Sequence, residues 1–169
     1  MIYTEKTIKA IKLMYDVHKD QVDKAGIPYP FHPFTVAFNM KDEVTTCVGL
    51  LHDVVEDTDI TLDNLREMGF GDEVVNALTK LTHADGQDYY EYVADLSTDP
   101  VAIQVKLADL RHNSDLSRLE DINNRAIERF QKYNICIPFL EHQLLLLGSG
   151  NVLQAVENAK TFKAEHHGD

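Results

Sequence analysis

The sequence predicts an all-α fold, and three observations support this prediction. Apolar residues recur mostly at helical spacing, capping and turn residues separate the apolar stretches, and no run of the chain shows convincing strand alternation. The chain has no internal repeat and no low-complexity linker. Its 169 residues are a usual length for one domain with a substantial core, so we expect a single domain over residues 1–169.

The predicted helices follow one another with short breaks. Thr4 is a suitable N-cap for the first helix, which carries apolar residues up to Val17. A turn-rich break over 26–31 precedes a second helix, where Pro33 suits the first position because its missing N–H costs nothing there. Further helices are expected over 43–55, from a Thr61 cap to Gly69, over 72–81, over 89–96, from Asp99–Pro100 to about His112, over 123–147 with a bend at Pro138, and from Val152 to about Phe162. The tail 166–169 is expected to fray.

Composition restricts the classes of protein to which this chain can belong. A formal charge of −12 repels polyanions, so we expect no extended contact with nucleic acid; a small phosphorylated ligand stays compatible, because a bound metal can reverse the local field. We expect neither a membrane span nor a secretion leader, since no apolar run is long enough. Cys47 and Cys136 have no paired spacing, which favours a reduced, cytoplasmic protein.

The stretch 50–58 contains the strongest functional signal. It places the adjacent pair His52–Asp53 in an apolar segment, where a carboxylate is costly unless a partner or a metal compensates it. In a continuous helix Glu56 and Asp57 stand four residues after these two, on the same face. The arrangement indicates a site; a helix end with a solvated acidic run is the alternative.

Three further residues complete this set of polar groups. His32 begins the second predicted helix after a constrained loop, and Asp109 lies in another apolar helix with Asn113 four residues later. Two His and two Asp side chains form a mixed nitrogen and oxygen ligand set that suits Mn²⁺ or Fe²⁺ and leaves positions open for water and substrate. Taken singly, His32 could be a helix cap, and Asp109 could pair with Arg111 or Lys106.

Together these residues resemble the H…HD…D pattern of the HD-domain metal-dependent phosphohydrolases. The similarity extends to the hydrolase domain of SpoT/Rel-type alarmone enzymes and to the small stand-alone ppGpp hydrolases, through the segments PYPFHP (28–33), HDVVED (52–57), TKL (79–81) and KLAD with HN (106–113). The resemblance covers about residues 6–119, and further helices are expected over 120–165. It implies an all-α HD-domain helical bundle with the metal site between helices.

The resemblance also implies a role for each matched residue. The ligands of one Mn²⁺ ion, or alternatively of Fe²⁺ or another transition metal, would be His32, His52, Asp53 and Asp109. Glu56 and Asp57 match the acidic pair that positions and deprotonates the attacking water. Lys24 matches a basic residue facing the pyrophosphates, and Asn113 matches a residue near the nucleotide sugar and base.

Two departures from the family pattern concern substrate recognition more than metal binding. Alarmone hydrolases usually carry Arg immediately before the Lys, where it stacks on guanine, and Asp23 occupies that position here. The usual Asp-Arg-Leu-His-Asn order is also changed, to Asp-Leu-Arg-His-Asn over 109–113. The expected reaction is Mn²⁺-dependent hydrolysis of ppGpp at the 3′ position, giving GDP and pyrophosphate. The alternatives are another HD-type nucleotide phosphohydrolase and a non-catalytic nucleotide-binding module.

Other polar and aromatic residues are expected to have structural roles. His18 is expected at the surface and His142 in the core, and the tyrosines of 89–92 are expected on a packed or half-exposed helix face. His83 is compatible with an approach to the site and equally with a helix C-terminus.

Overall fold

The computed structural model describes residues 1–166. The elements are α1 (Glu5–His18), α2 (Phe31–Phe38), α3 (Glu43–Leu51), α4 (Val54–Asp57), α5 (Leu62–Glu67), α6 (Asp72–Leu81), α7 (Tyr89–Leu96), α8 (Pro100–Asn113), the 3₁₀ helix η1 (Leu116–Arg118), α9 (Asn124–Gly148) and α10 (Val152–His166). The predicted all-α fold is confirmed for these residues, in which one isolated β-bridge joins Val22 and Pro28. None of the helices within 1–166 has the length and apolar character of a membrane span.

Side-chain caps explain where many of these helices begin. Thr4 and Thr61 each form a capping box with the third residue of the helix that follows. Both residues were predicted to be caps from the sequence. Asp99 accepts from the first-turn N–H groups of α8, and Pro100 occupies the adjoining first turn. The predicted limits of α6 and α7 are met at both ends. Pro33 is the third residue of α2 rather than its first, which is still a position whose N–H lacks an intrahelical partner.

The C-terminal end of the chain differs from the prediction. α10 continues to His166, beyond the expected end at Phe162, and the His166 ring donates from Nδ1 to the Phe162 carbonyl over 2.9 Å. The expected fraying therefore does not include His166, and positions 167–169 lie outside the described residues. The Phe162 ring also stacks on Phe139 of α9, with 3.8 Å between centroids, which holds the last two helices together.

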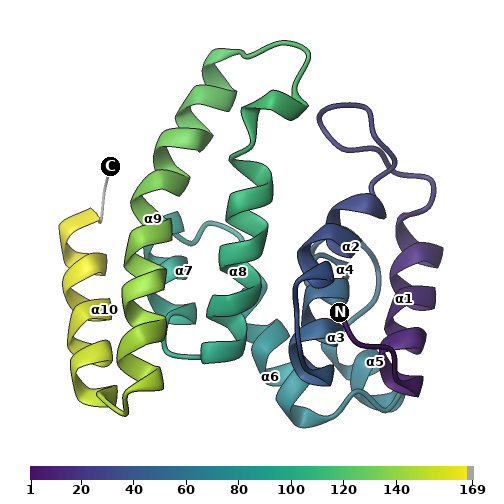
Figure 1. Ribbon diagram of the computed structural model, residues 1–169, viewed down its shortest axis with the longest axis horizontal. Helices are drawn as coiled ribbons and strands as arrows, with labels where there is room; N and C mark the ends of the chain where they lie inside the picture. Colours follow the sequence, from purple (N-terminus) through teal and green to yellow (C-terminus); the bar gives the residue numbers. More distant parts are fainter. Residues whose placement is uncertain (167–169) are drawn as a thin grey trace.

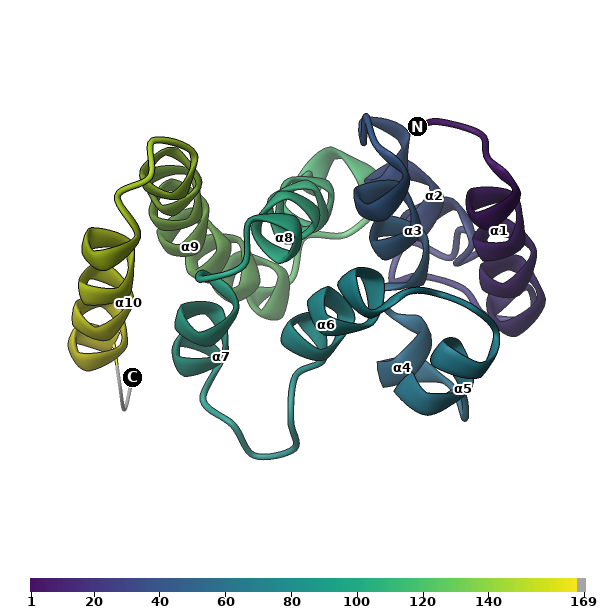
Figure 2. The same cartoon turned by 90° about the horizontal axis from the view of Figure 1, so that it is seen from below.

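The central helix of the molecule is α8. It packs against α9 on one side and against α2, α3 and α6 on the other, while α10 lies beyond α9 and α7 lies between α10 and α6 (Figures 1 and 2). The apolar side chains of α3 and α8 belong to the most deeply buried part of the core, with Leu51 and Ile103 fully enclosed. Because these two helices also carry His52 at the end of α3 and Asp109 in α8, the polar motif stands on rigid elements.

A glycine allows α2 and α3 to approach each other closely. A Cβ atom at Gly49 would lie 3.0 Å from Cα and 3.2 Å from Cβ of Ala37 in α2. Contacts of this length to backbone atoms cannot be relieved by a side-chain rotation, so only glycine permits this spacing. The close approach brings α2, which carries His32 in its first turn, beside α3, which His52 directly follows.

Two expectations about single histidines are wrong. His18 is fully buried rather than at the surface; its Nδ1 atom lies 2.8 Å from Gln21 Oε1 and its ring packs beside Tyr29. His142 is exposed on α9, because its helix face turns away from the core. The expectation for the tyrosines is confirmed, since Tyr90 and Tyr92 are buried within the helix packing.

Candidate metal centre and active site

A cavity of about 480 Å³ opens between three parts of the chain. The loop between α1 and α2 forms one wall, α4 forms the second, and the end of α8 with η1 and the start of α9 forms the third. In Figure 1 this loop faces the connection from α8 to α9 across the top of the molecule. The volume is that of a small-molecule site.

Two histidines and an aspartate from three helical segments meet beside this cavity, which His32 and Asp109 line. Potential ligand atoms of His32, His52 and Asp109 all lie within 4.8 Å of one another, and the three residues are buried. His32 Nε2 is 3.3 Å from Asp109 Oδ1, and His52 Nε2 is 3.9 Å from the same oxygen. Side chains from distant parts of the sequence thus converge on one point, where they could hold a metal ion.

The fourth expected ligand, Asp53, lies beside this cluster. Its Oδ2 atom is 3.4 Å from His32 Nε2 and 3.2 Å from His52 Nε2. The same oxygen accepts a hydrogen bond from the Tyr29 hydroxyl over 2.6 Å. The structure therefore brings all four side chains together and adds Tyr29, which the sequence did not single out, as a partner of Asp53.

The helix that carries the motif is interrupted, which corrects the expectation of one helix over 43–55. α3 ends at Leu51, His52 and Asp53 form a turn, and α4 begins at Val54. The Gly49 carbonyl, which an uninterrupted helix would use for the N–H of Asp53, is bonded by His52 Nδ1 over 2.9 Å. The expected stacking survives the break, because Asp57 N–H still donates to the Asp53 carbonyl.

His52 provides the test of whether a metal suits the site. Its Nδ1 atom faces a carbonyl and so must carry the ring hydrogen, which leaves a lone pair on Nε2. That Nε2 atom is buried and has no hydrogen-bond partner, although Asp53 Oδ2 is 3.2 Å away. An unpaired buried acceptor is costly, and a histidine that donates its other nitrogen to a carbonyl is the usual form of a metal ligand. The residues present therefore fit a divalent ion.

The charges of this cluster favour a cation. Burial opposes protonation of His32, but hydrogen bonds to Asp109 and Asp53 raise its pKa to about 9. Burial likewise disfavours the charged form of Asp53, but the electrostatic interaction with the neighbouring His52 ring and the hydrogen bond with His32 hold its pKa at about 2. Two ionised carboxylates beside two imidazoles attract positive charge, which a proton or a metal ion can supply.

Asp109 has a partner on each side of its carboxylate. Its Oδ2 atom pairs with Lys106 Nζ over 3.0 Å, and its Oδ1 atom accepts from Asn113 Nδ2 over 2.5 Å. Although burial opposes ionisation, the Lys106 charge lowers the pKa of Asp109. Of the two cation partners considered for Asp109, Lys106 is present, whereas Arg111 pairs with Glu141 of α9. The lysine pair and a metal are not exclusive, since Oδ1 remains directed at the histidines.

The acidic pair that follows the cluster lines the cavity. Glu56 accepts a hydrogen bond from the backbone N–H of His83, so this residue reaches the site through its main chain. Asp57 accepts from the Tyr29 hydroxyl over 3.3 Å. Loss of solvent raises the pKa of Glu56, and loss of solvent together with the Asp53 charge raises the pKa of Asp57. Both acids thus stand beside the cluster as proton acceptors.

Cations line the other two walls of the cavity. Lys24, which the sequence predicted, stands on the α1–α2 loop, and Arg118 and Arg129, which it did not predict, stand on η1 and α9. Burial and the nearby charge of Arg129 lower the pKa of Lys24, so these two cations repel each other without an intervening anion. Arg129 and Tyr133 stand four residues apart on α9, and this spacing was the sequence signal for one helix face, but it does not reveal which face meets the cavity.

Asp23 lines the cavity, but its charge is compensated. Its Oδ2 atom pairs with Arg118 Nη2 over 2.5 Å, and its Oδ1 atom accepts from the N–H groups of Ala25 and Ile27 over 2.8 and 2.9 Å. Asp23 therefore holds the Arg118 guanidinium of η1 at the cavity, so a guanidinium lines the cavity although residue 23 is not an arginine.

Comparison with known proteins identifies relatives of this chain. No protein-family model matches it. It is 36% identical over 140 residues to a probable guanosine-3′,5′-bis(diphosphate) 3′-pyrophosphohydrolase of Synechocystis sp., covering 73% of this chain and 18% of that protein. It is 32% identical over 145 residues to the bifunctional (p)ppGpp synthase/hydrolase SpoT of Escherichia coli, covering 74% and 20%. Other relatives are named GTP pyrophosphokinase.

A solved structure has the same fold. It comes from work described as showing that a metazoan ortholog of SpoT hydrolyzes ppGpp, and it matches with a TM-score of 0.68 at 20% identity, over 99% of this chain and 98% of its own. The all-α HD-domain fold is thereby confirmed, and the named relatives confirm the resemblance to the HD-type ppGpp hydrolase domain. The chain spans about a fifth of the length of the curated relatives it matches.

Proposed function

We propose, from this resemblance to the HD-type ppGpp hydrolase domain, that the chain is a metal-dependent phosphohydrolase that converts ppGpp to GDP and pyrophosphate by cleavage at the 3′ position. One observation carries the proposal: the His and Asp cluster adjoins a single cavity that has an acidic pair on one wall and cations on the other two. A phosphoryl-transfer site needs these three elements together. The proposal applies to one domain over residues 1–169.

The metal would be held by the four residues that lie close together beside the cavity, which are His32, His52, Asp53 and Asp109. We propose Mn²⁺, because mixed imidazole and carboxylate sets suit ions of this class, with Fe²⁺ or another transition metal as the alternative. When bound, such an ion supplies an acidified water and a polarised phosphoryl oxygen. The unpartnered Nε2 atom of His52 supports its place in the set.

The acidic pair would handle the proton of the attacking water. Glu56 is fixed by the His83 N–H and its raised pKa makes it a better proton acceptor than an ordinary carboxylate. Asp57 shares the Tyr29 hydroxyl with Asp53, and we assign it the orientation of the water rather than its deprotonation. A module that only binds nucleotide would gain little from two acids at this place, which favours an enzyme.

The cations would hold the phosphates of the substrate. Lys24 and Arg129 repel each other, and a pyrophosphate between them would remove that repulsion. Asn113, one turn from Asp109, would contact the sugar and base. This local positive wall makes a small polyanionic substrate compatible with a chain of net charge −12. We also infer a cytoplasmic setting, since both cysteines are free and buried.

A nucleotide panel tests the proposal. Purified protein with Mn²⁺ is incubated with ppGpp, with other 3′-phosphorylated nucleotides and with nucleotides phosphorylated only at the 5′ position, and the products are separated by anion exchange. We expect ppGpp to give GDP and pyrophosphate, and EDTA to stop the reaction. Cleavage of another 3′-phosphorylated nucleotide in place of ppGpp would indicate the alternative, an HD phosphohydrolase with a different base preference. Binding without any cleavage would indicate the non-catalytic module.

A further inference from the structure

A continuous chain of hydrogen bonds leads from the α1–α2 loop to the far side of His32. His32 Nδ1 lies 2.7 Å from His112 Nδ1, and Arg118 Nη1 lies 3.2 Å from that same His112 nitrogen and 3.1 Å from the His112 carbonyl. Arg118 Nη2 donates to Asp23 over 2.5 Å, and Asp23 in turn accepts from the loop N–H groups of Ala25 and Ile27.

We propose that His112, Arg118 and Asp23 are positioning residues that set the tautomer and the ring orientation of His32. The inference rests on the proposed role of His32 as a metal ligand. It names residues to which neither the metal set nor the acidic pair assigns a function. It also gives Asp23 a role that differs from base recognition.

The direction of each hydrogen bond follows from the donors that arginine carries. A guanidinium has N–H donors and no acceptor, so the contact from Arg118 requires His112 Nδ1 to act as an acceptor. An acceptor at His112 Nδ1 requires the hydrogen in the contact with His32 to come from His32 Nδ1. When His32 is neutral, as a metal ligand must be, its Nε2 atom therefore carries no hydrogen, and its lone pair is free for a cation held between this nitrogen and the carboxylates of Asp53 and Asp109. The arginine thus fixes the hydrogen positions of both rings.

The two histidines of the cluster therefore have different supports. His52 is oriented by a backbone carbonyl within its own helix, at Gly49. His32 is oriented by side chains from α8 and η1, and its ring packs beside that of His112 with 4.8 Å between centroids. A residue that hydrogen-bonds the second ring nitrogen of a metal-binding histidine commonly contributes about 10–100-fold to metal affinity. The support for His32 can accordingly be removed by mutation, whereas that for His52 cannot.

Asp23 connects the residues that orient His32 to the α1–α2 loop. Its carboxylate holds Arg118 with one oxygen and the loop that carries Lys24 with the other. An arginine at this position would place a second cation against Arg118 and remove both acceptors. We therefore expect Asp23→Arg to weaken metal binding, and not to improve recognition of guanine.

The test is the affinity of the full chain for Co²⁺ and Mn²⁺, measured by titration without nucleotide, with the visible spectrum of Co²⁺ as the report on ligand geometry. We expect His112→Ala to weaken binding about 10–100-fold and to change the spectrum. His112→Asn keeps an oxygen that can accept from His32 and should stay within a few-fold of the parent. Arg118→Gln and Asp23→Asn should weaken binding by smaller factors, and Asp23→Asn retains the acceptor for the loop.

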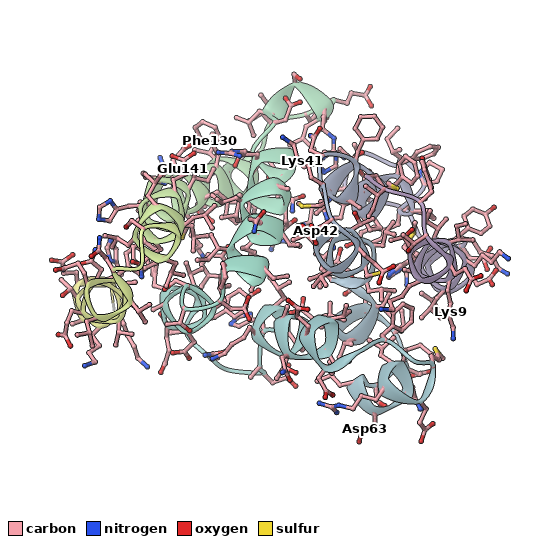
Figure 3. The ribbon with its side chains drawn as sticks, turned by 60° about the horizontal axis from the view of Figure 1, so that its bottom comes forward. Lys9, Lys41, Asp42, Asp63, Phe130 and Glu141 are labelled. Atoms are coloured by element: carbon pink, nitrogen blue, oxygen red, sulfur yellow. The ribbon has the colours of Figure 1, made fainter. Side chains whose placement is uncertain are left out.

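A double substitution separates positioning from simple support of the fold. If Arg118 acts through His112, the pair His112→Ala with Arg118→Gln should bind metal no more weakly than His112→Ala alone. The matched control is Glu141→Gln, which breaks another 2.5 Å arginine–carboxylate pair, between α8 and α9, at a residue that Figure 3 shows projecting from the surface. It should leave metal affinity unchanged.

Several results would overturn the inference. Unchanged metal affinity in His112→Ala, additive losses in the double variant, or the same loss in Glu141→Gln would each do so, as would a parent chain that binds no divalent ion. Should His112→Ala fail to fold, His112→Asn and Arg118→Gln decide the question. A parent chain that binds Co²⁺ and cleaves no nucleotide would contradict the proposed hydrolase activity. The positioning role of His112, Arg118 and Asp23 would then still be tested by the metal affinity of the variants. Full nucleotide hydrolysis with unaltered metal binding in the variants would end the inference alone.

Discussion

Glu56 and Asp57 are neighbours in α4, yet they have different partners and should respond differently to mutation. Glu56 is held by a backbone N–H and contacts none of the four candidate metal ligands, so Glu56→Gln should keep the metal. Turnover of ppGpp should fall by about 10²–10⁴-fold, because the amide cannot accept the proton of the attacking water. Metal analysis after dialysis and steady-state kinetics measure the two quantities.

The control for this substitution is Asp63→Asn, which neutralises an exposed carboxylate of α5 at the outer edge of the molecule (Figure 3). It should leave both quantities unchanged. Turnover by Glu56→Gln within a few-fold of the parent would show that the proton is accepted elsewhere, with Asp57 as the next candidate.

The two cysteines give a prediction about pH. Burial raises the pKa of Cys136 to about 12, and burial with the Glu43 charge raises the pKa of Cys47 to about 12. Both pKa values are higher in the folded chain than in the unfolded chain. Below about pH 9 the thiols are neutral in both states, so they do not reduce the free energy of unfolding. As the pH rises from there toward 12, the unfolded chain ionises first and the free energy of unfolding falls.

Chemical labelling and denaturation check this prediction. A thiol reagent at about pH 8 should react with neither cysteine in the folded protein and with both after unfolding. The midpoint of urea denaturation should fall between about pH 9 and 11 in the parent, and fall less in the variant Cys47→Ala. Stoichiometric labelling of the folded chain would show that a thiol is accessible, contrary to its burial.

Among the elements, α8 carries the most functional side chains, and its start depends on one cap. Asp99 accepts from the N–H groups of Val101 and Ala102 over 2.8 and 3.0 Å. Asp99→Ala leaves these donors without a partner and should cost about 1 kcal/mol, or about 2–4 °C in melting temperature for a chain of this size. Thermal unfolding measures the shift, and Asp85→Ala, an exposed loop acid, is the control. Equal melting temperatures for the two variants would contradict the role of the cap.

The limits of the elements were predictable where local chemistry sets them. Thr61 and Asp99 are caps that can be recognised from their neighbours alone, and α5 and α8 begin where these residues predict. The break after Leu51 was not predictable, because it depends on the His52 ring taking a carbonyl of its own helix. The helix η1 was missed for a similar reason, since Asp115 caps a turn too short for an apolar period.

The residues of the candidate site likewise divide into those that local sequence spacing predicts and those that only the tertiary structure brings together. Residues four apart on one helix, such as Asp109 and Asn113, share a face in any α-helix, and the structure places them in contact. Tyr29 and Arg118 could not be assigned from the sequence, because their partners Asp53 and Asp23 are 24 and 95 positions away. Only the packing of α2 and α8 around α3 decides which distant side chains meet.

For the whole molecule, a bound ion would join α2, the α3–α4 turn and α8. Because the ion binds the folded chain and these residues are dispersed in the unfolded one, chelation should lower the melting temperature of the metal-loaded protein. With free Mn²⁺ at about a hundred times its Kd, the loss amounts to about 5–10 °C. Calorimetry with and without EDTA measures it, and His52→Ala should not respond to EDTA. A metal-loaded parent that melts at the same temperature in EDTA would show that the ion does not link these helices.

The absence of a side chain at Gly49 has a consequence for ion selectivity. The distance between α2 and α3 is limited by the contact of Gly49 with Ala37, and each of these helices supplies one histidine to the cluster. By allowing a short separation of the helices, Gly49 should influence the size of the ion that the two imidazole rings can bind together. Gly49→Ala must push the helices apart, and it should therefore weaken Zn²⁺ more than the larger Cd²⁺ in competition titrations. An equal loss for both ions would mean that the helices keep their separation and that the strain is relieved elsewhere.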